Sequence, residues 1–409
     1  MNILHINTYD SGGAANSAIR LHKGLLKLGV NSHMLNLLKS NNQIPQNAYY
    51  YGVGKSKFSK IVYKLHLQPD KAARNKQLLS KATSGEVFSF ATSDFDITTH
   101  PLYKTADIIN LHWVAGFLDY PSFFEKNTKP VVWTLHDQFA FTGLCHYSGN
   151  CIQYQSKCTH CPLLQGTYVE KSFNIKAKAI QGVSNIHIVS PSKWLKETSE
   201  QSFLFKGFQH SLIPYGLDLN IFKPIDKKFA REFFNLPPDI PVFLFVSDNL
   251  STKRKGFDIL LKAIDGLSSD NLFCAVGYTE KQTNNVLSMG RIYDERLLAI
   301  LYSAADAFIL PSLEDNLPNT IVEAMACGTP VIGFNTGGVP DLVQTGLTGI
   351  LSHDTTPEAL RISIEEITGG KYNFSTKVIR EFALQNLSES KQALAYQKLY
   401  DSISNYALS

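Results

Sequence analysis

Two carboxylates lie eight positions apart in the second half of the chain, where the sequence predicts a loop followed by a helix. Asp315 belongs to the polar loop, and Glu323 lies one turn inside a helix that we expect to begin at about Asn319. The first amides of a helix, here near Asn319 and Thr320, have no intrahelical partner, and the helix dipole favours an anion beside them. Carboxylates accept hydrogen bonds from neighbouring hydroxyl groups. A diphosphate at the helix start would place flanking hydroxyl-bearing rings, such as a ribose and a hexose, within reach of both acids.

The plainer alternative for this acid pair is structural. Asp315 would then cap the helix, and Glu323 would be a charge on its solvated face. The elements around the pair bear on the choice. We expect a buried strand over 307–310, a short apolar strand over 331–334 and a turn at Gly337 and Gly338. Strand, loop, helix and strand in this order place a ligand at the carboxyl end of a parallel sheet.

A second candidate site lies near the amino terminus. An apolar strand over 3–6 leads into Gly12 and Gly13, after which apolar residues recur at helical spacing as far as Gly29. This order predicts a βαβ unit whose glycines let a ligand approach the backbone. The spacing is not G-x-G-x-x-G, which argues against a nicotinamide site. An ordinary turn is the alternative.

Two histidines end predicted strands in the same half. His112 follows the strand over 106–111, and His136 follows the strand over 131–135. The carboxyl ends of parallel strands form the ligand-bearing edge of a sheet, so either histidine could face a ligand. A structural role for each histidine is the alternative.

Four of the six cysteines fall within 17 residues, with spacing C-x5-C-x6-C-x2-C: Cys145, Cys151, Cys158 and Cys161. Without a recognisable secretion signal, such clustering favours metal over disulfides, and zinc suits four thiolates. The sequence therefore predicts a structural zinc site, with disulfides or unligated thiols as alternatives.

Composition bounds the remaining possibilities. A length of 409 residues predicts two domains, and 44% hydrophobic with 18% charged residues is an ordinary globular composition. We find no apolar run long enough to span a membrane and no secretory signal, so a cytoplasmic protein is expected. A net charge of +4 does not indicate nucleic acid as a partner. Segment 55–76 is basic with apolar residues at helical spacing, which suggests either peripheral membrane contact or a solvated helix.

The string over 311–349 closely resembles the signature of retaining glycosyltransferases of family 4, which have the GT-B fold. Their Glu-x7-Glu element precedes E-A-M-A-C-G-T-P-V, which starts here at Glu323, and a later G-G-x-P-[ED] starts at Gly337. The resemblance implies that Glu323 holds the nucleotide ribose. Asp315 stands where the first Glu usually contacts the donor sugar, and Glu314 is the alternative for that role.

The resemblance extends to further loops. It implies that Lys255 neutralises the donor diphosphate; Asp248 occupies the position of the usual arginine, so we expect Arg254 to supply the second cation. His136 matches a T-x-H-D element whose histidine faces the donor sugar. The resemblance therefore implies that His136 is a substrate-positioning residue, with His112 as its support. The remaining donor-binding candidates are Gly12, Gly13, Gly290, Arg291, Glu314, Asn316, Asn319 and Thr320.

A colanic-acid or exopolysaccharide branch of the family carries a similar cysteine-bearing loop. The resemblance to the family as a whole implies an α/β protein of the GT-B fold, with two Rossmann-like domains that face a cleft. We expect the amino-terminal domain to comprise residues 1–214 and a returning helix at about 388–409, and the carboxyl-terminal domain to comprise residues 215–387. The implied activity is retaining transfer of a hexosyl group from a UDP- or GDP-sugar to a glycan or lipid-linked glycan, without a catalytic metal. A nucleotide-sugar 2-epimerase and a silent sugar-nucleotide-binding protein are the alternatives.

Overall fold

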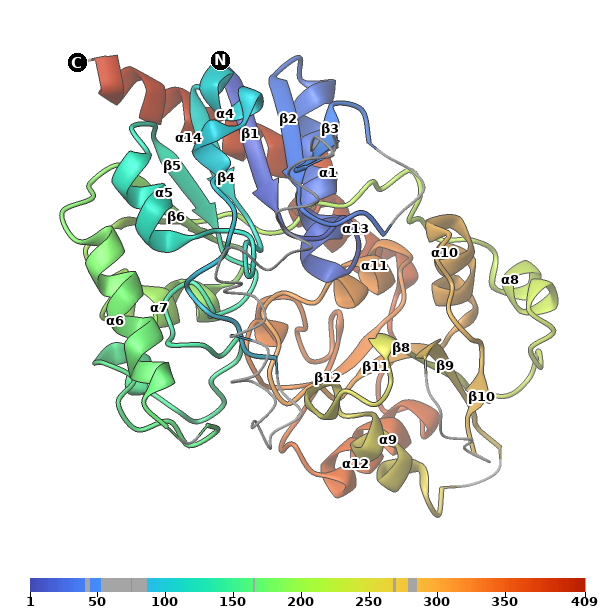
Figure 1. Cartoon of the computed structure of the whole chain (residues 1–409). Helices are drawn as coiled ribbons and strands as arrows, with labels where there is room; N and C mark the ends of the chain where they lie inside the picture. The colour runs from blue at the N-terminus through green and yellow to red at the C-terminus, as the bar shows by residue number, and fades with distance from the viewer. Residues whose placement is uncertain are drawn as a thin grey trace. The chain divides into compact units, whose positions relative to one another are not determined.

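The computed structural model describes residues 1–40, 45–52, 75, 87–164, 166–267, 270–278 and 285–408, with side chains as far as 404. The chain divides into two compact units (Figure 1). Unit 1 comprises Met1–Ile213 together with the residues from Ala393 onward, and unit 2 comprises Pro214–Gln392. The basic segment 55–76 falls outside the described residues, apart from Asn75.

Unit 1 is built on a seven-stranded parallel sheet in the order β3-β2-β1-β4-β5-β6-β7. Its strands are β1 (Asn2–Asn7), β2 (Asn31–Asn36), β3 (Ala48–Tyr50), β4 (Ile108–Leu111), β5 (Val131–Thr134), β6 (Ile186–Ser190) and β7 (Gln209–Leu212). Its helices are α1 (Gly13–Lys27), α4 (Pro101–Thr105), α5 (Tyr120–Lys126), α6 (Tyr168–Ile180) and α7 (Lys193–Gln201), joined by most of α14 (Glu389–Leu408).

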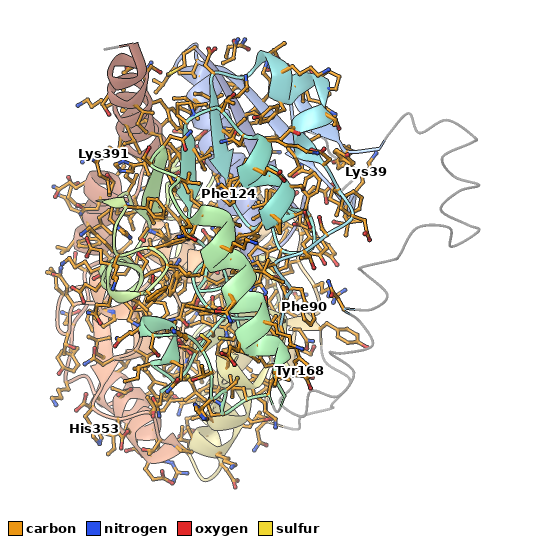
Figure 2. The ribbon with its side chains drawn as sticks, turned by 60° about the vertical axis from the view of Figure 1, so that its left-hand side comes forward. Lys39, Phe90, Phe124, Tyr168, His353 and Lys391 are labelled. Atoms are coloured by element: carbon orange, nitrogen blue, oxygen red, sulfur yellow. The ribbon has the colours of Figure 1, made fainter. Side chains whose placement is uncertain are left out.

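Alternating side chains of β1 explain why both faces of this sheet are covered. Ile3 packs with residues of α1 and α14, whereas Leu4 and Ile6 pack on the opposite side with residues of α4, α5, α6 and α7. Helix α6, with Tyr168 at its start, runs beside α5, which carries Phe124 (Figure 2). Strands buried on both faces read as mainly apolar runs, as the central strands β4 and β5 do.

Unit 2 repeats the same plan with six parallel strands in the order β10-β9-β8-β11-β12-β13. The strands are β8 (Val242–Asn249), β9 (Leu272–Tyr278), β10 (Leu287–Ser288), β11 (Ala307–Leu310), β12 (Val331–Phe334) and β13 (Gly349–Ser352). One face is covered by α9 (Phe257–Ile264) and α12 (Pro357–Thr368). The other face is covered by α8 (Lys227–Phe233), α10 (Glu295–Ala304), α11 (Asn319–Ala326) and α13 (Thr376–Asn386).

In each sheet the order of the strands runs outward in both directions from the first strand of the unit, as in Rossmann-type sheets. Ligands are therefore expected beyond the carboxyl ends of β1 and β4 in unit 1, and of β8 and β11 in unit 2. The predicted strands over 307–310 and 331–334 and the helix start at Asn319 are confirmed. Within the described ranges, no helix combines the length and apolar character needed to cross a bilayer.

Helix α14 is joined to the sheet of unit 1 by buried hydrogen bonds as well as by apolar contacts. The Tyr400 hydroxyl accepts a hydrogen bond from the Asn110 side-chain amide at 2.6 Å, and the Tyr396 hydroxyl lies 2.9 Å from that of Thr134. Thr134 also donates to Asn110 at 2.9 Å. Because all four side chains are buried, the loss of one partner leaves a polar group unsatisfied.

We predict that Tyr400→Phe lowers the free energy of unfolding of unit 1 by about 1–3 kcal/mol, since Asn110 then loses a buried acceptor. Urea titration followed by tryptophan fluorescence measures this, because all three tryptophans, Trp113, Trp133 and Trp194, belong to unit 1. The control is Tyr49→Phe at an exposed ring, with a change below about 0.5 kcal/mol. Equal effects of the two changes would contradict the prediction.

Candidate functional site

The loops that follow β8 and β11 meet at the switch point of unit 2. The first ends in a short turn, Lys253–Lys255, before α9, and the second connects β11 to α11. The two loops are joined through their main chains, since Leu313 N–H donates to the Arg254 carbonyl at 2.8 Å. The sequence therefore folds its cationic turn against its acidic loop at the ligand-bearing edge of the sheet.

An ion pair between a buried carboxylate and a partly exposed lysine connects these loops through their side chains. The Lys255 ammonium lies 2.5 Å from Asp315 Oδ2, and an Arg254 guanidinium nitrogen lies 3.9 Å from the same oxygen. Asp315 is only 6% exposed. Burial raises the pKa of its carboxyl group, but the charges of Lys255 and Arg254 outweigh that effect and hold the pKa below its ordinary value. Asp315 is thus an anion with two cations beside it.

Two glycines let the backbone come close enough for this pair to form. Gly256 has φ +74°, and an added Cβ would lie 1.9 Å from the Pro311 carbonyl oxygen. Gly337 has φ +53°, and an added Cβ would lie 1.9 Å from the Asp315 carbonyl oxygen. The neighbouring Gly338 N–H donates to that same oxygen at 3.0 Å. Only glycine fits at either position, which gives the predicted Gly337–Gly338 turn its physical reason.

Glu323, the second acid, is 6% exposed on α11. The Tyr302 hydroxyl of α10 donates to its Oε2 at 3.2 Å. Helix α11 begins at Asn319 without a side-chain cap from Pro318, and Asn319 and Thr320 are half-buried. Asp315 and Glu323 therefore lie before and inside the first turns of one helix, as the sequence predicts.

The other candidates of unit 2 lie in the same loops or on the same edge. Glu314 contributes its main-chain carbonyl, which accepts from Arg254, while its side chain is half-buried. Asn316 is buried, and its amide donates to the Tyr215 hydroxyl at 3.5 Å. Gly290 accepts from Gly277 N–H at 2.8 Å, at the carboxyl end of β9. Arg291 lies over the Tyr278 ring at 4.9 Å.

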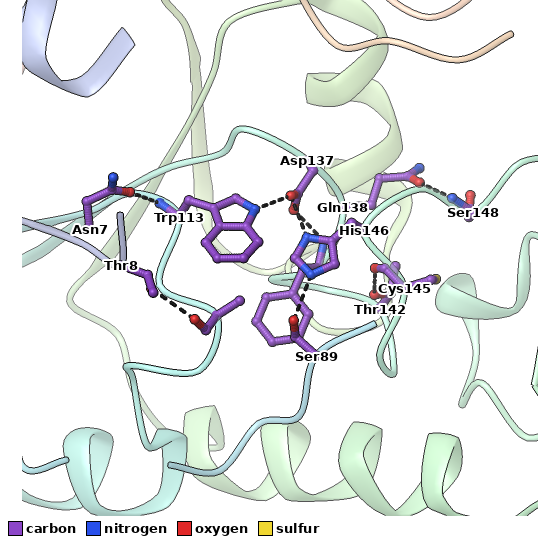
Figure 3. A network of polar contacts seen from close by, with 12 residues as sticks. Asn7, Thr8, Ser89, Trp113, Asp137, Gln138, Thr142, Cys145, His146 and Ser148 are labelled. Carbon is purple, nitrogen blue, oxygen red and sulfur yellow. Dashed lines mark hydrogen bonds and ion pairs between the residues drawn. The ribbon is translucent and has the colours of Figure 1, made fainter. Parts of the chain in front are cut away.

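In unit 1, a polar network fills the carboxyl edge of β4 and β5 (Figure 3). Asp137 accepts hydrogen bonds from the Trp113 indole at 2.7 Å, from His146 Nδ1 at 2.6 Å and from Phe139 N–H at 2.9 Å. The His146 ring stacks between Trp113 and Phe139, with centroids 5.0 Å from each. A small pocket beside this network is lined by His112, Trp113, His136 and Asp137, among other residues.

The remaining candidates of unit 1 lie at the ends of β1, β4 and β5. Gly12 has φ +91° and precedes α1, which begins at Gly13. His136 is 8% exposed, and its Nε2 lies 3.0 Å from His112 Nδ1. Burial lowers the pKa of His136 to about 4. Both histidines therefore join the edge at which the sequence placed them.

The cysteine loop does not form the expected zinc site in this structure. Cys145, Cys151, Cys158 and Cys161 are free thiols, and burial raises the pKa of Cys145 to about 12 and that of Cys158 to about 11. Among the described residues, no group of three histidine, cysteine or acidic side chains is arranged to hold a metal ion. Structural zinc therefore stays a prediction from spacing, which metal analysis of the purified protein tests.

Three residues with roles at these sites were missed from the sequence. Tyr302 holds Glu323, Trp113 holds Asp137, and His5 of β1 lies against His112 with its Nδ1 2.9 Å from His112 Nε2. Only His5 left a signal, because it interrupts the apolar strand 3–6 with a buried polar side chain. The partners of Tyr302 and Trp113 are far away along the chain, on other elements.

The chain is similar in sequence to known glycosyltransferases. Residues 240–368, which contain every predicted site residue of unit 2, match the family model described as glycosyl transferases group 1. The putative colanic acid biosynthesis glycosyl transferase WcaC of Escherichia coli K12 is 24% identical over 386 residues, which cover 90% of this chain and 91% of that protein. A D-inositol 3-phosphate glycosyltransferase of Mycobacterium tuberculosis is 34% identical over 151 residues, 33% of this chain and 31% of that protein.

Solved structures share the architecture of the whole chain. Sucrose-phosphate synthase from Thermosynechococcus elongatus superposes with a TM-score of 0.70 at 20% identity and covers 100% of both chains. HepE of Anabaena, solved in complex with UDP and glucose, gives a TM-score of 0.65 at 17% identity over 98% of this chain and 100% of that one. The expected α/β fold of GT-B type is confirmed.

We predict that Gly337→Ala destabilises unit 2 by more than Gly346→Ala, which is the matched control. Both glycines have positive φ, but an added Cβ at Gly346 would meet nothing closer than 3.8 Å. The control therefore costs about 1 kcal/mol from its backbone conformation alone, whereas Gly337→Ala must also displace the Asp315 loop. Thermal unfolding followed by circular dichroism compares the two, and similar melting temperatures would contradict the assignment.

The neutral, buried His136 makes a second prediction about stability. Because its pKa is lowered from 6.5 to about 4, the stability it contributes is complete above pH 6.5 and is lost as the pH falls toward 4. The free energy of unfolding of the wild type falls as the pH is lowered from neutral to about 5. We predict that this fall is smaller by roughly 2 kcal/mol in His136→Gln. Tryptophan fluorescence in urea measures both proteins. If His136→Gln keeps the wild-type pH dependence of the unfolding free energy, the prediction is wrong.

Proposed function

We propose that this chain, a glycosyltransferase of the GT-B fold with a group 1 domain over residues 240–368, moves a hexosyl group from a nucleoside diphosphate sugar to an acceptor hydroxyl group. The acceptor is a glycan or lipid-linked glycan, and the transferred sugar keeps its anomeric configuration. The similarity to WcaC favours a role in exopolysaccharide synthesis. We place the reaction in the cytoplasm, with peripheral membrane contact through 55–76 as a further part of the proposal.

One observation supports this proposal above the others. Unit 2 buries two acids, Asp315 and Glu323, around the start of α11 and directs the cations of Lys255 and Arg254 at the first of them. A nucleoside diphosphate sugar needs contacts of these kinds: cations and helix amides for the phosphates, and carboxylates for ring hydroxyl groups. The four side chains lie within the range that matches the group 1 family.

We assign the roles as follows. Glu323, held by Tyr302, binds the ribose hydroxyl groups. Asp315 takes the place of the first acid, because it is the side chain that is buried and ion-paired, whereas Glu314 offers its main-chain carbonyl to Arg254. Gly290 and Arg291 lie toward the base, and Asn316, Asn319 and Thr320 line the phosphate end. In unit 1, Gly12, Gly13 and His136 position a reacting sugar.

The chemistry then follows from charge. The bond between the anomeric carbon and the diphosphate oxygen breaks, and its electron pair leaves with the nucleoside diphosphate. Negative charge on the leaving group increases during this step, so cations held in place by the protein stabilise the transition state more than the bound donor. Lys255, Arg254 and the amides near Thr320 supply that charge. The acceptor hydroxyl attacks from the face that the diphosphate leaves, and the departing phosphate oxygen accepts its proton.

The proposed activity is tested with a panel of UDP- and GDP-sugars, first by thermal shift and then with lipid-linked and oligosaccharide acceptors. Transfer of the sugar with the anomeric configuration retained supports the proposal. An isomerised donor without transfer would instead indicate a nucleotide-sugar epimerase, and binding without turnover would indicate a sugar-nucleotide sensor. Either of these results would overturn it.

We predict that Lys255→Ala lowers kcat by about 10²-fold or more, because the leaving diphosphate loses a fixed cation. Donor affinity, measured by calorimetry, should fall by less than that factor, since the contact strengthens as charge develops. Lys253→Ala is the control: Lys253 is an exposed cation of the same turn, and its loss should leave kcat within about threefold. Full activity of folded Lys255→Ala would remove Lys255 from the mechanism.

A further inference from the structure

Three buried imidazoles form a continuous chain across the sheet of unit 1. His5 comes from β1, His112 follows β4 and His136 follows β5, three strands that are neighbours in the sheet. His5 Nδ1 lies 2.9 Å from His112 Nε2, and His112 Nδ1 lies 3.0 Å from His136 Nε2. The exposed fractions are 0%, 3% and 8%. Each contact therefore uses Nδ1 of the inner ring and Nε2 of the next ring outward.

All three rings are uncharged at neutral pH. Burial lowers the pKa of His5 and of His112 well below 6.5 and that of His136 to about 4. A neutral imidazole carries one N–H and one lone pair. Each of the two contacts requires one N–H facing one lone pair, so the three protons must all lie on Nδ1 or all on Nε2. The chain has only these two arrangements that satisfy both contacts.

The inner end of the chain decides between them. Nε2 of His5 is buried and has no hydrogen-bond partner within the part of the protein that the structure describes. Protons on Nε2 would leave an orphaned N–H at that end, whereas protons on Nδ1 leave only a lone pair there. Buried donors without a partner are rarer in proteins than buried acceptors without one. The arrangement with protons on Nδ1 is therefore favoured.

We propose that His5 and His112 are positioning residues that fix His136 in the tautomer with its proton on Nδ1 and with Nε2 accepting from His112. This inference rests on the proposed function, in which His136 positions a reacting sugar. His112 supplies the hydrogen bond that selects the tautomer of His136, and His5 supplies the one that selects the tautomer of His112. His136 then offers the same N–H to its surroundings in every molecule.

The tautomers are measured directly by long-range ¹H–¹⁵N correlation spectra of protein labelled in its 12 histidines, with His136→Gln identifying the signals of His136. We expect the wild type to show a protonated Nδ1 and a bare Nε2 at His136. His112→Leu should convert this to a mixture of tautomers. His112→Asn, whose amide can replace the Nδ1–H donor, should restore the wild-type pattern, and His187→Leu, outside the chain of rings, should leave it unchanged.

Kinetics supply the second readout. His112→Leu should lower kcat by about tenfold, the effect of one lost hydrogen bond, with KM for the donor within about twofold. His112→Asn should recover most of that loss. His5→Leu and His5→Asn form a matched pair one ring further inward and should show the same order with smaller effects. These pairs keep the test decisive if one leucine variant fails to fold.

A proton on Nε2 of His136 in the wild type would overturn the inference, and so would a His136 tautomer that stays fixed in His112→Leu. The spectra need neither donor nor acceptor. If the protein shows the predicted tautomers but transfers no sugar, the tautomer assignment stands and the proposed function fails. If the protein transfers sugar while His136 shows the opposite tautomer, the proposed function stands and the tautomer assignment fails.

Discussion

The partly buried ion pair between Lys255 and Asp315 constrains how the two loops of the unit 2 site can be placed. Its two partners follow different strands, so the pair forms only if β8 and β11 are neighbours with both loops on one edge. A buried pair stabilises little by itself, yet removal of one partner leaves an uncompensated charge. Gly256 and Gly337 serve that constraint, because larger residues would push the loops apart.

Much of this could be predicted from the sequence where the determinants are local. The strands over 307–310 and 331–334 follow from short apolar runs, and the helix start at Asn319 follows from the polar loop before it. The two carboxylates were also predictable, since a loop acid and a helix acid eight positions apart must lie on either side of the start of one helix. Arg254 was expected as the second cation, and it does lie beside Asp315.

What the sequence could not provide is the set of partners that hold these residues. Tyr302 reaches Glu323 from another helix, and Trp113 reaches Asp137 from another strand end, so each contact exists only after the sheet has assembled. The zinc site predicted for the cysteines stays a prediction. Their spacing suggested a closed metal site, but the loop places them as free thiols without the required grouping among the described residues. Spacing along a loop does not determine how the loop folds.

The return of α14 to unit 1 has a consequence for synthesis on the ribosome. Tyr396 and Tyr400 are translated after the whole of unit 2, yet they complete the face of a sheet whose strands all precede unit 2. Until they arrive, Asn110 and Thr134 lack those partners and the apolar face around Ile3 is uncovered. Unit 2, which ends at Gln392, can therefore become complete while the nascent unit 1 still lacks the residues from Ala393 onward. This inverts the usual order, in which the domain that begins first along the chain matures first.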